Sequence, residues 1–150
     1  MSRPTLLSMQ KFLVSISIAL LSLMALPLHA QQSRLFPDSA GTKVRYNATI
    51  EMAKGYVSGV CIMVNDEGII KGSLFNEFGI SAIDFTYDPD TKKVKLLSVI
   101  KMLNKWYIKK VLKKDLVQVM ENLSKGIPSY QDKKYKIDYN FTVLKDAAEE

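Results

Sequence analysis

The sequence predicts an α+β fold, in which a twisted antiparallel sheet of about six strands is covered by a helical insertion before the last strand. Two observations predict it. Apolar and polar residues alternate over several short stretches, as in half-exposed strands, and turns of only a few residues join these stretches. One longer stretch, residues 103–125, instead has the spacing of an amphipathic helix.

The predicted strands follow one another closely along the chain. Residues 43–52 alternate cleanly, whereas residues 56–64 are apolar on both faces and predict a strand in the middle of the sheet. Because the connecting turns are short, the first five strands should form an antiparallel meander that a last strand closes. The remaining predicted strands are 69–76, 80–87, 95–100 and 135–143.

The helical stretch changes its apolar face along its length. At about 100° per residue, the apolar residues before position 113 and those after position 115 point in directions that differ by roughly 110°. A straight helix would not turn its buried face so far, so we predict two short helices, or one sharply kinked, with the break at residues 113–115. Asp115 would cap the second piece, and Gly126 with Pro128 would end it.

The first 30 residues have the features of a secretory signal peptide. Arg3 and Lys11 supply positive charge, residues 12–28 form an uncharged apolar run, and Ala30 is a small residue at its exit. The run is short for a membrane span, which needs about 20 apolar residues, so we expect cleavage rather than anchoring. The mature chain would comprise a lead-in loop at 31–42, a single domain at 43–144 and a polar tail at 145–150.

The mature chain lacks residues on which much enzyme chemistry depends. The only histidine, His29, lies in the expected leader, and Cys61 is the only cysteine. This excludes Ser-His-Asp and Cys-His catalysis and an ordinary structural zinc site. Ser98 and Lys101 have the spacing of a serine nucleophile with a lysine base, but in a strand they would face opposite sides. We therefore expect no enzyme, no metal and no other cofactor, with Cys61 as a buried thiol.

The net charge of +6 is concentrated in one segment. Residues 91–114 hold nine lysines and no acidic residue, whereas the rest of the mature chain is net acidic. Trp106 falls among these lysines on the helical wheel, an arrangement that suits the headgroup region of an anionic membrane. The predicted membrane or partner patch consists of Lys105, Trp106, Lys109, Lys110 and Lys113.

Two other interpretations of this patch stay open. The lysines could form a solvated helix face with Trp106 folded onto the sheet, since lysine stems often cover a domain's own surface. The patch could also dock an acidic protein partner in the cell envelope, which would make the protein a structural or interaction module. Nucleic acid is not expected as a partner, because the chain is predicted to be exported and its strands carry no interleaved aromatic residues around the patch.

About half of the mature chain carries a family resemblance, over residues 59–115. The stretch begins with the predicted strands that flank residues 65–68, and it continues with Asn76-Glu77-Phe78-Gly79-Ile80, Ile83-Asp84-Phe85 and Leu112-Lys113-Lys114-Asp115-Leu116. In these features the chain resembles the LolA/LolB-like half-barrel proteins of the Gram-negative envelope. Small exported proteins of Bacteroidetes look similar over the same stretch.

This resemblance implies a half-barrel, a sheet curved around an apolar cavity with helices as a lid. It further implies a non-enzymatic protein that binds an acyl chain or the lipid of a lipoprotein. Because no lipid-attachment cysteine follows the leader, the chain looks more like the soluble carrier of that group than its anchored receptor, in the periplasm or at the periphery of the outer membrane. The candidate lipid-binding residues on the concave face are Tyr46, Ile62, Leu74, Phe85 and Tyr139.

Overall fold

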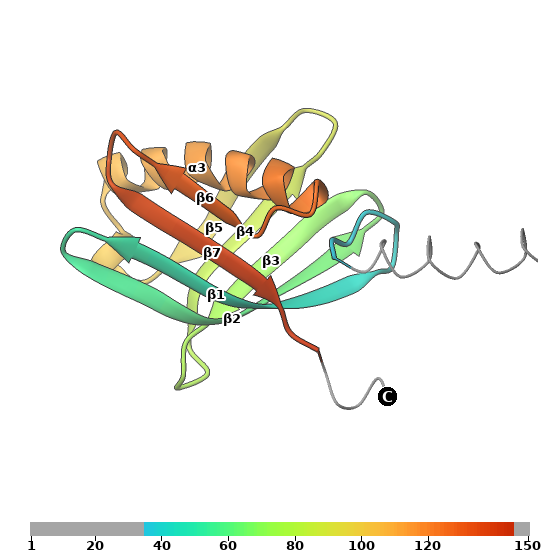
Figure 1. The fold of residues 1–150 in the computed structure, drawn as a ribbon, viewed down its shortest axis with the longest axis horizontal. Helices are drawn as coiled ribbons and strands as arrows, with labels where there is room; N and C mark the ends of the chain where they lie inside the picture. Colours follow the sequence, from blue (N-terminus) through green and yellow to red (C-terminus); the bar gives the residue numbers. More distant parts are fainter. Residues whose placement is uncertain (1–34, 146–150) are drawn as a thin grey trace, which may run out of the picture. The chain divides into compact units, whose positions relative to one another are not determined.

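The computed structural model describes residues 35–145, which form one curled antiparallel sheet, a half-barrel, with a helix against its inner face (Figure 1). The order of the seven strands across the sheet is β5-β4-β3-β2-β1-β7-β6. The expected leader and residues 146–150 of the tail lie outside the described residues. The elements are β1 (Lys43–Met52), β2 (Gly55–Asp66), β3 (Ile69–Phe75), β4 (Ser81–Asp88), β5 (Lys93–Val99), η1 (Lys101–Leu103), α3 (Trp106–Ser124), β6 (Ser129–Asp132) and β7 (Ile137–Val143).

The predicted meander of five strands is confirmed, and β2 lies in the middle of the sheet as its apolar sequence predicted. The sequence prediction missed β6, which pairs with β7 at the edge of the sheet. This strand has four residues and a largely polar sequence, so it carries no usable alternation. The last strand begins at Ile137 rather than at Tyr135, because residues 133–136 form the turn between β6 and β7 and Lys136 has a φ of 55°.

Alternation along the strands separates an apolar inner face from a more polar outer face. In β1, for example, Tyr46, Ala48 and Ile50 are buried, whereas Arg45 and Asn47 are exposed. The cross-strand register continues the inner face from strand to strand: Tyr46 lies opposite Cys61, and Ile50 lies opposite Tyr139. The inner face is therefore one continuous apolar surface that must be covered.

The predicted break at residues 113–115 is wrong, because α3 runs without interruption from Trp106 to Ser124. Asp115 is not a cap but a buried residue inside the helix, only 1% exposed. The helix therefore has a single buried stripe, and the apolar residues of its first turn lie partly beyond the core and stay partly exposed. The stripe consists of Leu112, Asp115, Leu116, Val119, Met120 and Leu123.

The helix α3 closes the open side of the half-barrel, since it contacts β5 at one edge of the sheet and β6 at the other. It ends at Ser124, and Gly126 stops it as predicted: its positive φ of 80° and its N–H bond to the Leu123 carbonyl form a Schellman motif together with the bond from the Ile127 N–H to the Asn122 carbonyl. In the part of the chain that the structure describes, no helix has the length and apolar content needed to cross a membrane.

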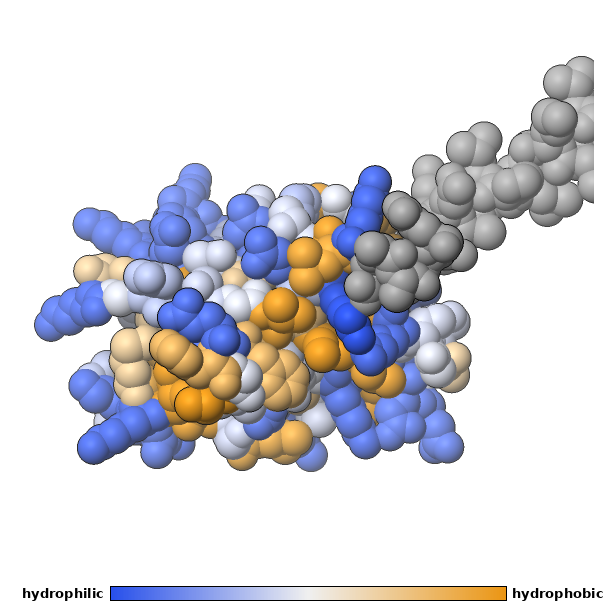
Figure 2. All heavy atoms as spheres, turned by 90° about the horizontal axis from the view of Figure 1, so that it is seen from below, coloured by the Kyte–Doolittle hydropathy of each residue, from blue (hydrophilic) through white to orange (hydrophobic). Residues whose placement is uncertain are grey.

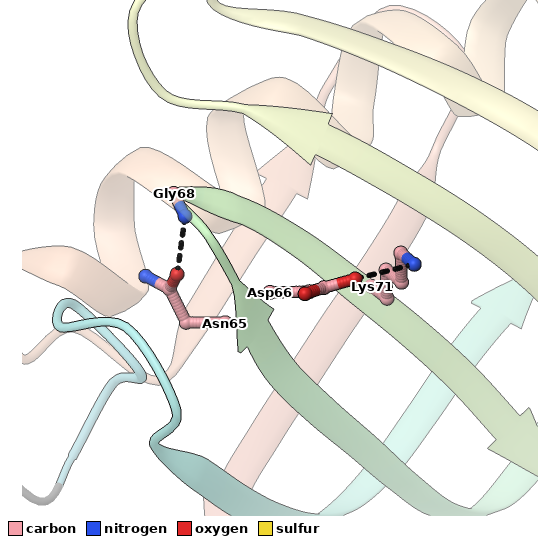
Figure 3. A network of polar contacts seen from close by, with 4 residues as sticks. All are labelled: Asn65, Asp66, Gly68 and Lys71. Carbon is pink, nitrogen blue, oxygen red and sulfur yellow. Dashed lines mark hydrogen bonds and ion pairs between the residues drawn. The ribbon is translucent and has the colours of Figure 1, made fainter.

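The turn between β2 and β3 fastens the start of the domain to the sheet (Figure 3). The buried Asn65 accepts a hydrogen bond from the Gly68 N–H at 2.8 Å and donates one to the Pro37 carbonyl at 2.8 Å. Asp66 and Lys71 form an exposed ion pair at 2.7 Å on the same hairpin. The side chain of Asn65 thus shapes the turn and holds the lead-in segment in place.

In the middle of the sheet a Cβ atom would clash at two glycines, Gly59 against the Phe75 carbonyl and Gly72 against the Phe85 ring. Gly72 of β3 lies opposite Phe85 of β4, and a Cβ atom at position 72 would lie 2.3 Å from the Phe85 Cζ atom. The Phe85 ring therefore occupies the space above the Gly72 backbone, and this close approach is a reason for glycine inside a strand.

We expect the substitution Gly72→Ala to destabilise the domain by about 1–3 kcal/mol, because the added methyl group must displace a buried ring. Urea unfolding would measure this change in the free energy of unfolding. Gly55→Ala is the matched control, since its Cβ would meet only Met102 Sδ at an ordinary 3.6 Å. The double variant Gly72→Ala/Phe85→Leu should recover part of the lost stability. Equal stability of Gly72→Ala and Gly55→Ala would refute this explanation.

Candidate functional site

The start of α3 presents an unusually exposed aromatic side chain. Trp106 is 76% exposed, and its ring meets that of Tyr107 edge to face at a centroid distance of 5.8 Å. The interpretation in which Trp106 folds onto the sheet is therefore wrong. Tyr107 is itself half exposed, so the pair forms an apolar projection at the beginning of the helix.

The lysines predicted to accompany Trp106 surround it in the structure. Lys105 precedes the helix, and Lys109, Lys110 and Lys113 follow at spacings of one and two turns, which places them on the same side as Trp106. Lys109 is partly buried and the other three are exposed. The structure therefore brings all five residues of the predicted patch together on one surface of the helix.

Other exposed apolar side chains adjoin this patch, and sequence analysis did not find them. The short helix η1 packs on the β1–β2 turn, where Met102 Sδ lies near Gly55, and both Met102 and Tyr56 are exposed. Figure 1 shows this turn and the start of α3 at the same end of the molecule. We call this surface the aromatic–lysine end; it comprises Lys54, Tyr56, Lys101, Met102, Lys105, Trp106, Tyr107, Lys109, Lys110 and Lys113.

The β3–β4 turn adds two more exposed apolar residues beside this end. Phe78 is 77% exposed and Ile80 is 57% exposed. The turn leads into β4 next to η1, where the Ile100 N–H donates to the Ala82 carbonyl at 2.9 Å. Tyr56, Phe78 and Trp106 come from three separate parts of the chain, so no periodicity along the sequence could have grouped them.

A group of acidic residues lies at the opposite ends of the strands. Asp66 and Glu67 belong to the β2–β3 turn, and Asp88 and Asp90 belong to the β4–β5 turn. Ion pairs of the described residues are found there as well, between Lys71 and Asp66 and between Lys92 of the β4–β5 turn and Glu121 near the end of α3. The aromatic–lysine end faces away from these four acids, although Glu51 of β1, opposite Tyr56, lies at that end itself.

Four of the five predicted lipid-binding residues share the inner face of the sheet. Tyr46, Leu74, Phe85 and Tyr139 are at most 2% exposed and pack in the core under α3. The Tyr46 hydroxyl donates to the Leu35 carbonyl at 2.7 Å, and burial raises the pKa of Tyr46 above its usual range. In the structure these residues contact other parts of the protein, so a ligand could reach them only if α3 moved.

The placement of Ile62 on the concave face is wrong. Ile62 lies opposite Arg45 and Ser73, on the outer face, because it is one residue away from the inward-facing Cys61 and side chains alternate along a strand. There it lines an open hollow of about 690 Å³ with Val64 and Phe75. Figure 2, which views the molecule from below, shows apolar residues gathered in the middle of the face between hydrophilic residues.

A pair of carboxyl groups lies where α3 meets the edge of the sheet. The Tyr139 hydroxyl of β7 donates to Asp115 Oδ2 at 2.8 Å, and Asp115 also shares a hydrogen bond with Asp132 at the end of β6. Asp115 is 1% exposed and Asp132 is 8% exposed. A hydrogen bond between two carboxyl groups requires that one of them carry a proton.

The surroundings assign this proton to Asp115. Burial, followed by the hydrogen bond and charge of Asp132, raises the pKa of Asp115 to about 7, although the Tyr139 hydroxyl acts in the other direction. For Asp132, burial acts to raise the pKa, but hydrogen bonds from Asp115 and from the backbone N–H groups of Tyr135 and Lys134 outweigh it and leave the pKa low. The two groups therefore titrate as a coupled pair.

Ser98 belongs to a cluster of three serines around Asp84. Its hydroxyl donates to Asp84 Oδ2 at 2.6 Å, while Ser73 and Ser81 donate to Asp84 Oδ1 at 2.6 and 2.7 Å. Partial burial opposes ionisation of Asp84, but the three serine hydrogen bonds prevail and lower its pKa. The cluster joins β3, β4 and β5 on the outer face, which accounts for the serine that the sequence pattern had singled out.

Comparison with known proteins adds no relative: no family model, curated protein or solved structure matches the chain. The resemblance to LolA/LolB-like proteins therefore stays a prediction from sequence. The half-barrel with a single covering helix and an aromatic–lysine end has to be interpreted from its own geometry.

The buried thiol of Cys61 gives a direct check on the core. Cys61 is a free, fully buried cysteine, as predicted, and burial raises its pKa to about 12. We expect no rapid reaction with a thiol reagent such as Ellman's reagent at pH 8 in the native protein, and one reactive thiol per chain in urea. A rapid reaction of the native protein would show that the inner face is accessible to solvent.

Proposed function

We propose that this protein is an exported, non-enzymatic protein of the cell envelope that docks on an anionic membrane surface through its aromatic–lysine end and binds lipid there. The observation that carries the proposal is the 76% exposure of Trp106 among Lys105, Lys109 and Lys110. Its expected location is the periplasm or the periphery of the outer membrane.

The energetics of this end favour a membrane over water. An indole ring that stands in solvent leaves a large apolar area exposed, and each Å² that is buried contributes about 25 cal/mol. Lysines near an anionic leaflet contribute about 1 kcal/mol each at low salt. Trp and Tyr side chains also prefer the headgroup level, where one part of the ring is in an apolar medium and the other is wet. Together these terms support reversible binding to a membrane surface.

The proposed lipid ligand is an acyl chain or the lipid of a lipoprotein. Support comes from the continuous apolar inner face and from its cover, which is one helix that begins within the aromatic–lysine end. A membrane-bound start of α3 would bring the apolar inner face next to the source of the ligand. The four inward candidates, Tyr46, Leu74, Phe85 and Tyr139, are the residues that an acyl chain would contact after a displacement of the helix.

Tryptophan fluorescence tests the docking step directly, because Trp106 is the only tryptophan of the chain. With vesicles of phosphatidylglycerol and phosphatidylcholine at low salt, we expect a blue shift of its emission as the indole leaves water. Vesicles of pure phosphatidylcholine should give little shift, and high salt should weaken binding to the anionic vesicles, because the attraction is electrostatic.

Two charge-reversal variants make this test specific. Lys109→Glu/Lys113→Glu should reduce the affinity for anionic vesicles by about tenfold or more. Lys93→Glu/Lys95→Glu changes the net charge equally but lies on β5 away from this end, and should bind nearly as the wild type does. If the lysines matter but Trp106 shows no blue shift, an acidic protein partner becomes the better explanation. Absence of binding in every variant would refute membrane docking.

The lipid-binding step needs a separate measurement. We expect native mass spectrometry of the protein purified from its host to show a population with a mass increase that matches an acyl-chain lipid. Recovery of the lipid-free protein alone, together with failure to extract lipid from anionic vesicles, would refute lipid binding while leaving surface docking to be judged on the fluorescence result.

A further inference from the structure

The attachment of α3 to the edge of the sheet has a polar component that the proposed function does not use. Most of the buried stripe of the helix is apolar, but Asp115 lies in the middle of it and meets Asp132 and Tyr139 of the β6–β7 hairpin. An apolar residue at position 115 would pack there without a desolvation cost. A buried carboxyl at this place makes the contact between helix and sheet depend on protonation.

We propose that the Asp115–Asp132 pair is a pH-sensitive latch, which holds α3 against the β6–β7 hairpin while the pair keeps a proton and loosens the helix when the proton leaves. In the protonated state Asp115 donates to Asp132 and accepts from the Tyr139 hydroxyl, so each group has a partner. After deprotonation, two carboxylates face each other in a site from which water is largely excluded, and this repulsion acts between the helix and the sheet.

The groups that face the pair come from each element packed around it. Beyond Asp115 itself, α3 supplies Lys114, which favours the ionised forms of both carboxyls without being buried with them. β6 supplies Asp132 and Tyr130, and β7 supplies Tyr139. The turn between these strands supplies backbone N–H groups to Asp132. The single lysine is outweighed, since burial and the neighbouring carboxylate dominate at Asp115.

The direction of the pH effect follows from linkage. The attached helix keeps the Asp115 proton up to a pH of about 7, whereas a detached helix would lose it near the usual aspartate pKa of 3.8. Between these two values the attached state binds more protons than the detached state, so its stability falls as pH rises and levels off above about pH 7. The low pKa of Asp132 acts in the opposite direction only in more acidic solution, below this window.

This inference rests on the proposed function for its biological meaning, because the latch controls the helix that covers the proposed lipid site. A protein in mildly acidic surroundings would hold α3 closed and keep its apolar inner face covered. Neutral or alkaline surroundings would favour the looser state, in which an acyl chain could enter or leave. The latch itself is a property of the chain and can be measured without lipid.

Hydrogen exchange of the full chain, followed by mass spectrometry between pH 5.5 and pH 8.5, tests the latch. After correction for the intrinsic exchange rate, we expect the protection factors of the α3 amides to fall roughly tenfold or more across this range in the wild type. The protection of β2 and β3, in the middle of the sheet, should change much less. Equal changes in both regions, or no change in α3, would overturn the proposal.

Three variants isolate the carboxyl pair. Asp115→Asn imitates the protonated group, since an amide can donate to Asp132 and accept from Tyr139, so α3 protection should become independent of pH. Asp132→Asn removes the repulsion from the other side, and should have the same effect if Asp115→Asn does not fold. Asp138→Asn is the matched control on the exposed face of β7 and should behave as the wild type. A wild-type pH profile in both folded Asn variants would refute the latch.

The latch and the membrane proposal can fail separately. Asp115→Asn leaves the aromatic–lysine end unchanged, so its binding to anionic vesicles should equal that of the wild type. A pH-dependent α3 without vesicle binding would keep the latch and refute docking. Vesicle binding with a pH-independent α3 in the wild type would keep docking and refute the latch.

Discussion

The structure depends on the contact between one helix and one curled sheet. The sheet turns most of its large apolar side chains to the inside, and α3 is the element that covers them by reaching from edge strand β5 to edge strand β6. Five apolar side chains of the helix enter this contact, and each buried side chain of this kind contributes roughly 1.5–3 kcal/mol. Their sum is comparable to the net stability of a whole domain, which is about 5–15 kcal/mol. Attachment of α3 and folding of the sheet are therefore closely coupled.

The same helix links the two regions on which the functional proposal rests. Its first turn carries Trp106 and the lysines at one end of the molecule, and its middle carries Asp115 at the junction with β6 and β7. Docking at the first turn of α3 and protonation of Asp115 in its middle would therefore act on the same helix. In this view, docking and the covering of the inner face belong to one structural unit, and the sheet is the scaffold against which the helix is held.

The sequence predicted the parts of the fold that depend on regular patterns. Alternation and short turns predicted the meander, and the apolar run of β2 predicted its central position. Helical spacing grouped the lysines with Trp106. Predictions failed where tertiary packing overrode the local sequence pattern. Asp115 was taken as the cap of a second helix, whereas it is buried inside one continuous helix, and the face of Ile62 was misjudged because β2 is apolar on both sides. Tyr56 and Phe78 could not be grouped with Trp106, since only the fold brings separate turns to one region.

The pairing of β1 with β7 has a consequence for the order in which the molecule can assemble. β1 is the first strand of the domain, but its second neighbour is the last strand, so nearly the whole chain must be present before the centre of the sheet is complete. Strands β1 to β5 can pair locally as hairpins, whereas β7 must reach β1 from a distance of about 90 residues in sequence. Until then the outer edge of β1 has unpaired backbone groups beside an uncovered apolar surface, a combination that favours aggregation. The last strand of the domain to be synthesised therefore protects the first strand from aggregation.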